Sequence, residues 1–201
     1  MLRRSLAVLA ALAAALAVAP FAAAAVVHIR VEGKTQTIFG AAQPRLSAAT
    51  PLDALAGAAR AGEFYAHVAS SSFGNYVDQI GFYPAGGNSG WVFKVNGVSP
   101  PVAADQVQLE DGDVVLWYWA TFGATGGPPT LSLSRVQRRC YRVVEQNDAG
   151  KVSPAVGAVL HVDGRTVRTR GATGGAVACL SGRHGPVWAS LAGAVRSNRV
   201  P

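Results

Sequence analysis

Alternating apolar and polar residues predict short strands along most of the chain. Val27, Ile29 and Val31 alternate with His28 and Arg30, a pattern typical of a half-buried strand. Similar runs, bounded by glycine, proline or asparagine, predict further strands at 35–39, 64–68, 76–83, 91–95 and 114–119.

One segment of this first half predicts a helix. Thr50 suits the N-cap, Pro51 the first helical position, and Asp53 a place where a carboxylate meets free backbone N–H groups. Gly62 is expected to stop the helix. Its apolar stripe is expected at Leu52, Leu55 and Ala59. One helix among these strands predicts an α+β domain at 26–122, in which the helix packs on a mixed sheet.

Turn signals divide the rest of the chain. Asn96-Gly97 predicts a tight hairpin turn, and Asp111-Gly112 predicts another turn. A Gly- and Pro-rich linker is predicted at 123–129. Residues 130–201 show only strand and turn patterns, including a strand at 155–162 that ends in the hairpin signal Asp163-Gly164, and they predict an all-β sandwich.

The N-terminus has a different pattern, which predicts export. Arg3 and Arg4 precede an unbroken apolar run at 6–18, and small residues follow at 22–25. A charged start, an apolar stretch and a small-residue cleavage site are typical of a secretory signal peptide, here 1–25. The apolar run is shorter than the roughly 20 residues of a membrane-spanning helix, so we expect a secreted, extracytoplasmic protein without a membrane span.

Charge changes sign at the predicted linker. Residues 26–129 hold five Lys/Arg and eight Asp/Glu, whereas residues 130–201 hold eleven and three. This asymmetry supports two domains. Four arginines cluster early in the second domain: Arg135, Arg138, Arg139 and Arg142. They form either a solvated face or a contact for an anionic cell-envelope polymer. Nucleic acid is not expected as a partner, because no aromatic residues are interleaved with them.

The chain has two cysteines, Cys140 and Cys179, both in the second half. In an exported protein an even pair favours a disulfide, with metal ligation or two free thiols as the alternatives. We expect no metal site, because His and carboxylates at ligand spacing are missing near either cysteine.

Catalytic motifs are not apparent. The sequence lacks a nucleophile elbow, a zinc-protease helix motif, a phosphate-binding loop and a dinucleotide fingerprint. The four histidines are widely separated, and Asp111 and Asp113 flank a glycine in a way that favours a turn over calcium ligation. We therefore predict a non-enzymatic protein without a cofactor. An enzyme with a dispersed catalytic triad stays open as an alternative, because the residues of a triad come together in space and not in sequence.

Four segments of the first half resemble a known family. They are 50–55 (TPLDAL), 76–80 (YVDQI), 90–97 (GWVFKVNG) and 111–118 (DGDVVLWY). They are similar to the small C-terminal domain of the transcobalamin and intrinsic-factor carriers, which is also widespread on bacterial secreted proteins. The resemblance implies a β-grasp-like fold and, as ligand, cobalamin or a related flat cofactor-like molecule.

The ligand contacts implied in this way lie in one loop and the following hairpin. They are Asn88, Ser89, Trp91, Phe93 and Asn96. Glycines in the loop at 86–90 allow backbone N–H groups to approach a ligand closely, and the aromatics add apolar area. The alternative is that Trp91 and Phe93 are core residues and that Asn96 belongs only to a turn.

The second half resembles the transthyretin-like sandwich modules of surface proteins. The resemblance rests on 148–150 (DAG), 157–164 (GAVLHVDG) and 173–176 (TGGA), and it implies an immunoglobulin- or transthyretin-like scaffold. The leading hypothesis is thus a secreted binding protein with a ligand module and a spacer. The rival is a cell-envelope interaction, adhesion or structural protein that takes no small molecule.

Overall fold

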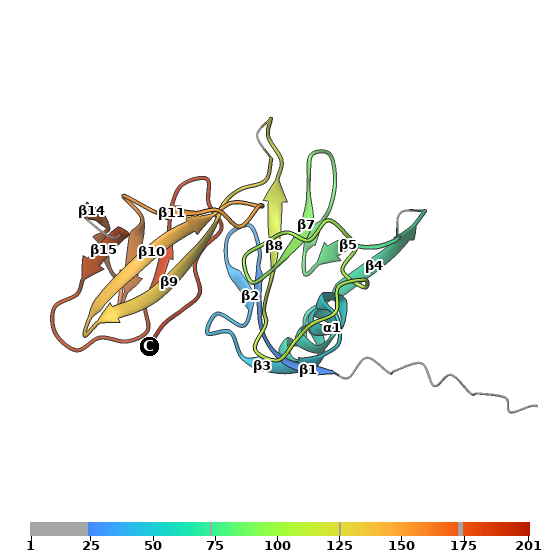
Figure 1. The fold of residues 1–201 in the computed structure, drawn as a ribbon, viewed down its shortest axis with the longest axis horizontal. Helices are drawn as coiled ribbons and strands as arrows, with labels where there is room; N and C mark the ends of the chain where they lie inside the picture. The colour runs from blue at the N-terminus through green and yellow to red at the C-terminus, as the bar shows by residue number, and fades with distance from the viewer. Residues whose placement is uncertain (1–23, 73, 125, 173–174) are drawn as a thin grey trace, which may run out of the picture.

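A computed structural model describes residues 24–72, 74–124, 126–172 and 175–201. The signal peptide predicted at 1–25 lies outside the described residues apart from its last two positions. The protein consists mostly of strands in several sheets, with one short helix, α1 (Pro51–Gly62). Figure 1 shows the helix with the strands of the first half on one side, and the strands of the second half on the other.

The main sheet of the first half is mixed. Its order is β2 (Thr37–Phe39), β1 (Ala25–Glu32), β8 (Val114–Thr121) and β7 (Ser89–Val95), and β3 (Arg45–Ala48) also pairs with β1. The central pair β1–β8 is parallel, and the other pairs are antiparallel. Because α1 packs against this sheet, the predicted arrangement of one helix on a mixed sheet is confirmed for this half.

A second, antiparallel sheet lies beside the main one. It contains β4 (Ala66–Ser71), β5 (Gly74–Ile80) and β6 (Tyr83–Pro84). Two predicted strands therefore have different bounds in the structure. The strand predicted at 64–68 is shifted toward the C-terminus, and the strand predicted at 76–83 is divided into two by a turn at Gly81. β5 packs against β7 without pairing with it.

The helix begins as the sequence predicts. The Thr50 hydroxyl accepts a hydrogen bond from the backbone N–H of Asp53, and the Asp53 carboxylate accepts one from the backbone N–H of Thr50. This reciprocal capping box satisfies two N–H groups that a helix start leaves unpaired. Gly62 is the last helical residue, and Glu63 caps the end in the left-handed region. The buried face is rotated from the predicted stripe and consists of Pro51, Ala54, Leu55 and Ala58.

The second half is a sandwich of two antiparallel sheets. One sheet has the order β11 (Val152–Pro154), β10 (Cys140–Gln146), β15 (Gly175–Cys179) and β14 (Arg170–Ala172), with β9 (Thr130–Gln137) also on β10. The other sheet contains β13 (Arg165–Arg168), β12 (Val159–Val162) and β16 (Trp188–Ser190). Both contribute to one core that includes Tyr141, Val143, Leu160, Val187 and Ala189. The strand predicted at 155–162 is shorter, and the Asp163-Gly164 hairpin turn is confirmed.

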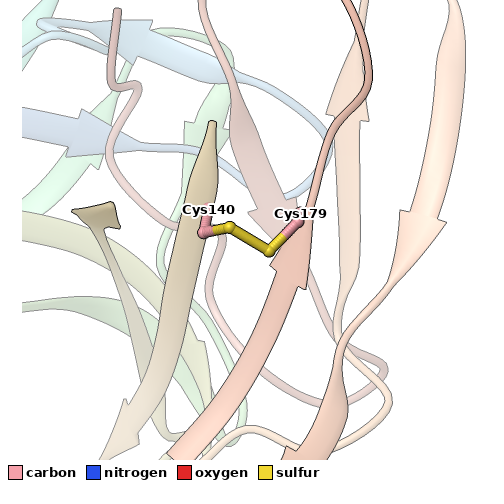
Figure 2. The surroundings of a disulfide bond; sticks show 2 residues. All are labelled: Cys140 and Cys179. Carbon is pink, nitrogen blue, oxygen red and sulfur yellow. A yellow bond between two sulfur atoms is a disulfide. The ribbon is translucent and has the colours of Figure 1, made fainter. Parts of the chain in front are cut away.

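The predicted disulfide joins neighbouring strands of this sandwich. Cys140 on β10 lies directly opposite Cys179 on β15, with their Cα atoms 4.0 Å apart, and the two sulfur atoms are bonded (Figure 2). The bond closes a segment of 39 residues and removes the alternatives of metal ligation and free thiols.

Buried polar contacts join the two halves of the chain. Glu32 is fully buried on β1 and forms ion pairs with Arg30 at 3.4 Å and with Arg196 at 2.9 Å. Arg196 also donates a hydrogen bond to the carbonyl of Gly33, and Arg30 donates one to the carbonyl of Arg196. Glu32 and Arg196 belong to different halves, and their side chains are 0% and 15% exposed, so a largely buried ion pair links the two halves.

Candidate binding groove

A groove of about 520 Å³ lies where β5, β7 and β8 meet the loop that follows β7. We call it the aromatic groove. Its volume falls within the range of about 300 to 1,000 Å³ typical of small-molecule sites. It is lined by Ser71, Gly74, Asn75, Tyr76, Val77, Trp91, Val92, Phe93, Ser99, Pro100, Ala103, Ala104, Trp117, Tyr118, Phe122 and Asp148.

Two aromatic pairs lie along β7 and β8, and three of their four rings form one wall of the groove: Trp91, Phe93 and Trp117. Trp91 and Trp119 lie opposite each other on β7 and β8, with ring centroids 5.6 Å apart and edge to face. Phe93 and Trp117 form the next pair along the strands, with centroids 5.1 Å apart. Pairs of this kind contribute about 0.5–1.5 kcal/mol beyond their buried area. The packing of these rings against one another stabilises this wall of the groove.

The indole N–H groups in this wall are already used within the protein. Trp91 donates to the carbonyl of Tyr83 at 2.8 Å, and Trp117 donates to the carbonyl of Pro51 at 3.0 Å. Neither indole N–H is available to a ligand, so these rings offer apolar surface only. Tyr76 and Phe122, which are 52% and 39% exposed, stand at the solvent side of the groove.

Of the five sequence-predicted contacts, Trp91 and Phe93 line the groove, and Asn88, Ser89 and Asn96 lie away from it. The Asn88 amide donates to the carbonyl of Phe122 at 3.0 Å, and the Ser89 hydroxyl lies 2.8 Å from that of Thr121. These two residues close the start of the β7–β8 pair.

Asn96 closes the other end of β7. Its side chain donates to Asp113 at 2.7 Å and accepts from the backbone N–H of Val114 at 2.9 Å. Asn96 and Gly97 both have positive φ, as a tight two-residue turn between Val95 and Val98 requires. The predicted hairpin turn is confirmed, and the hydrogen bonds of the Asn96 side chain serve the turn and not the groove.

The polar side of the groove comes from a residue that sequence reasoning did not select. Asp148, in the turn between β10 and β11, accepts hydrogen bonds from the Tyr118 hydroxyl at 3.2 Å and the Ser99 hydroxyl at 3.4 Å. It also pairs with the fully buried ammonium of Lys94 at 3.4 Å. Burial raises the pKa of Tyr118, and the neighbouring Asp148 carboxylate raises it further. The sequence shows only turn chemistry at 147–150, so no local signal marks Asp148.

A second carboxylate lies behind the groove. Asn75, a lining residue, donates to Asp105 at 2.7 Å through one carboxylate oxygen. The other oxygen of Asp105 is buried and has no hydrogen-bond partner among the residues that the structure describes. An unpaired buried polar atom of this kind is uncommon in folded proteins.

The arginine cluster lies on the β9–β10 hairpin. Tyr141 pairs with Arg135 and Arg142 with Ser134, so Arg135 and Arg142 occupy adjacent register positions that point to opposite faces. Arg135 donates to the Tyr141 hydroxyl at 3.2 Å and to the carbonyl of Pro201. Arg138 is exposed near the hairpin end, and Arg139 has a positive φ in the turn. The four do not share one face.

The histidines and the other candidate metal-binding side chains do not gather at one site. The four histidines have separate partners on different elements: His28 with Gln43, His67 with Asp78, His161 with Ser190 and His184 with Gly185. Within the ranges that the structure describes, His, Cys, Asp and Glu side chains form no group of three that could hold a metal ion. The same ranges contain no helix with the length and apolar character to cross a membrane.

A comparison with known protein families finds a match for one segment of the chain. Residues 62–121 match a family described as a domain of unknown function (DUF4430). No curated protein matches the chain. The matched segment contains β4 to β8, and thus most of the residues that line the aromatic groove. Because that family is transcobalamin-like, the resemblance seen in the sequence is supported for this segment at the level of the family.

Proposed function

We propose that this is a secreted, non-enzymatic binding protein and that the aromatic groove holds its ligand. The observation that carries the proposal is a preformed concave surface lined by Trp91, Phe93, Trp117 and Tyr118 and bordered by exposed Tyr76. Aromatic walls with a few polar groups at one side are typical of ligand sites. The disulfide supports export, because such bonds persist in oxidising compartments.

The resemblance to the transcobalamin family, with its β-grasp-like fold, suggests a corrinoid as the ligand. Trp91 and Phe93 supply apolar contact area, and the Asp148 carboxylate and Tyr118 hydroxyl supply polar groups. The groove is open to solvent along the side of Tyr76 and Phe122, so a large flat ligand stays partly hydrated. We therefore expect a modest affinity, with a Kd of about 1 μM or weaker.

Titration of the purified protein with cyanocobalamin tests this proposal. Absorbance and tryptophan fluorescence should both saturate, and Tyr76→Ala should weaken binding by about fivefold, since one exposed aromatic contact is lost. Phe82→Ala is the matched control, because Phe82 is 95% exposed and does not line the groove. No saturable signal up to about 1 mM would remove the corrinoid.

A second function is favoured by a separate observation. The strand β7 ends the main sheet, and part of its outer edge is free beside the groove. A free strand edge suits protein partners better than a flat cofactor. We propose cell-envelope interaction as this second function.

A further inference from the structure

The hydrogen-bond pattern of β7 shows which of its backbone groups face outward. In an antiparallel pair, residues alternate between those that bond to the neighbouring strand and those that point away. Asn88 accepts from the backbone N–H of Phe122, and the backbone N–H of Asn96 donates to Val114. Between these two ends, Gly90, Val92 and Lys94 therefore bond to β8, and the residues at odd positions face outward.

Four odd-numbered residues of β7 thus present their N–H and C=O groups to the outer edge. Ser89 satisfies both groups with Gly86, and Val95 satisfies both with Val98. Trp91 and Phe93 lie between them. Within the ranges that the structure describes, the backbone groups of these two residues have no hydrogen-bond partner. The open edge, as we call it, therefore consists of two donors and two acceptors.

The open edge lacks the sequence features that usually protect a strand edge from pairing. Natural edges are blunted by proline, by outward lysines or by bulges. The segment Ser89–Val95 contains no proline, and its pairing with β8 is regular from end to end. Its one lysine, Lys94, points into the domain junction and is fully buried. The edge lies in the groove, since Trp91, Val92 and Phe93 are all lining residues.

We propose, on the basis that the aromatic groove is the binding site proposed above, that its occupant is an extended peptide segment of a partner protein. The segment adds to β7 as a further strand and pairs its main chain with Trp91 and Phe93. At about 3.4 Å per residue, the open edge accommodates roughly three to five residues of partner chain. Main-chain bonds supply affinity in this mode, and pockets for alternate side chains supply specificity.

Charge in the groove indicates which peptide fits. Among the described lining residues, Asp148 is the charged one, and its side chain is 42% exposed. One of its carboxylate oxygens carries the three contacts to Lys94, Tyr118 and Ser99, and the other lies toward the backbone of Gly127. The unpaired oxygen of Asp105 adds negative potential behind Asn75. Although Lys94 offsets part of this charge, Asp148 is partly exposed in the groove and favours a peptide that carries a lysine or arginine over one that carries a carboxylate.

Hydrogen exchange on the whole protein tests the proposal. The probes are capped peptides of about seven residues that alternate valine and threonine, with a central lysine or a central glutamate. In the free protein the amides of Trp91 and Phe93 should exchange quickly and those of Val92 and Lys94 slowly. Binding of the lysine peptide should slow the hydrogen exchange of the Trp91 and Phe93 amides by at least about tenfold. Two N-methylated versions of the lysine peptide separate its two edges. Methylation of the amides that face β7 should abolish the protection of Trp91 and Phe93, whereas methylation of the amides that face away should leave it unchanged.

Matched variants test the charge preference. The lysine peptide should bind about tenfold more tightly than the glutamate peptide. Asp148→Asn should remove most of this difference, since asparagine keeps an acceptor for Tyr118 and Lys94 and loses the charge. Glu110→Gln is the control, because Glu110 is exposed and lies outside the groove.

Three results overturn the proposal. One is binding of neither peptide while cyanocobalamin still saturates, which leaves the groove as a small-molecule site. Another is peptide binding that leaves the exchange of Trp91 and Phe93 unchanged. The last is protection of these amides that rises with protein concentration alone, which makes a second copy of the chain the occupant. Failure of both peptides and cyanocobalamin removes the proposed function itself.

Discussion

At the scale of single residues, Lys94 connects the groove to the junction between the two halves. Its buried ammonium donates to the carbonyls of Gln146 and Asn147, each at 3.0 Å, and pairs with Asp148. Burial lowers the pKa of Lys94, and the Asp148 carboxylate opposes that shift. The contacts with the two carbonyls and with Asp148 therefore offset part of the cost of burying this side chain.

Replacement of this cation should destabilise the whole protein. Lys94→Met keeps the approximate length of the side chain and removes the donor that Gln146, Asn147 and Asp148 share, so we expect a loss of about 3 kcal/mol in the free energy of unfolding. Urea denaturation measures the loss. Lys151→Met is the control, because Lys151 is exposed and should cost less than about 0.5 kcal/mol. Equal losses in the two variants would contradict the role assigned to Lys94.

Tyr118 makes the stability depend on pH in the alkaline range. Burial and the adjacent Asp148 raise its pKa in the folded state above the ordinary value of 10.0. The unfolded chain loses this proton first, so the contribution to stability is complete below about pH 10 and decreases as the pH rises further. Tyrosinate absorbance during alkaline titration should include a late step that coincides with unfolding. That step should be missing in Tyr118→Phe, and its persistence there would contradict the assignment.

At the scale of elements, local signals predicted the helix start well, because a capping box needs only residues close in sequence. Thr50→Ala removes the hydroxyl that accepts from Asp53 and should cost about 1 kcal/mol. Thermal unfolding measures this, with Thr166→Ala on exposed β13 as a control that should leave Tm nearly unchanged. If Thr50→Ala lowers Tm no more than the control does, the cap does not contribute to stability.

The candidate site was predictable only in part. Trp91 and Phe93 line the groove, and the alternating aromatic strand that holds them is visible in the sequence. Trp91 is also a buried core residue and Phe93 packs against that core, as the alternative interpretation expected. Asn96 was interpreted as a contact, whereas its side chain is used by the turn. Asp148 was missed, because its position beside Tyr118 depends on how two domains pack, and no local pattern encodes that.

At the scale of the whole molecule, the junction couples the halves. We therefore expect one unfolding transition, although two domains were predicted. Replacing Cys140 and Cys179 together with serine should lower stability by about 3.5–4 kcal/mol, as the chain-entropy model predicts for this loop. Calorimetry should still show a single transition at a lower Tm. A first half that unfolds at the original temperature would contradict the coupling, because it would show that Glu32 and Lys94 do not hold the halves together.

The most direct test of the aromatic groove as a binding site uses the four tryptophans of the chain. Trp91 and Trp117 line the groove, and Trp188 lies on β16 in the other half. In spectra of protein labelled with ¹⁵N-tryptophan, saturating cyanocobalamin or the lysine peptide should shift the indole signals of Trp91 and Trp117. The Trp188 signal should stay in place. Shifts confined to Trp188, or no saturable shift with either ligand, would contradict the account.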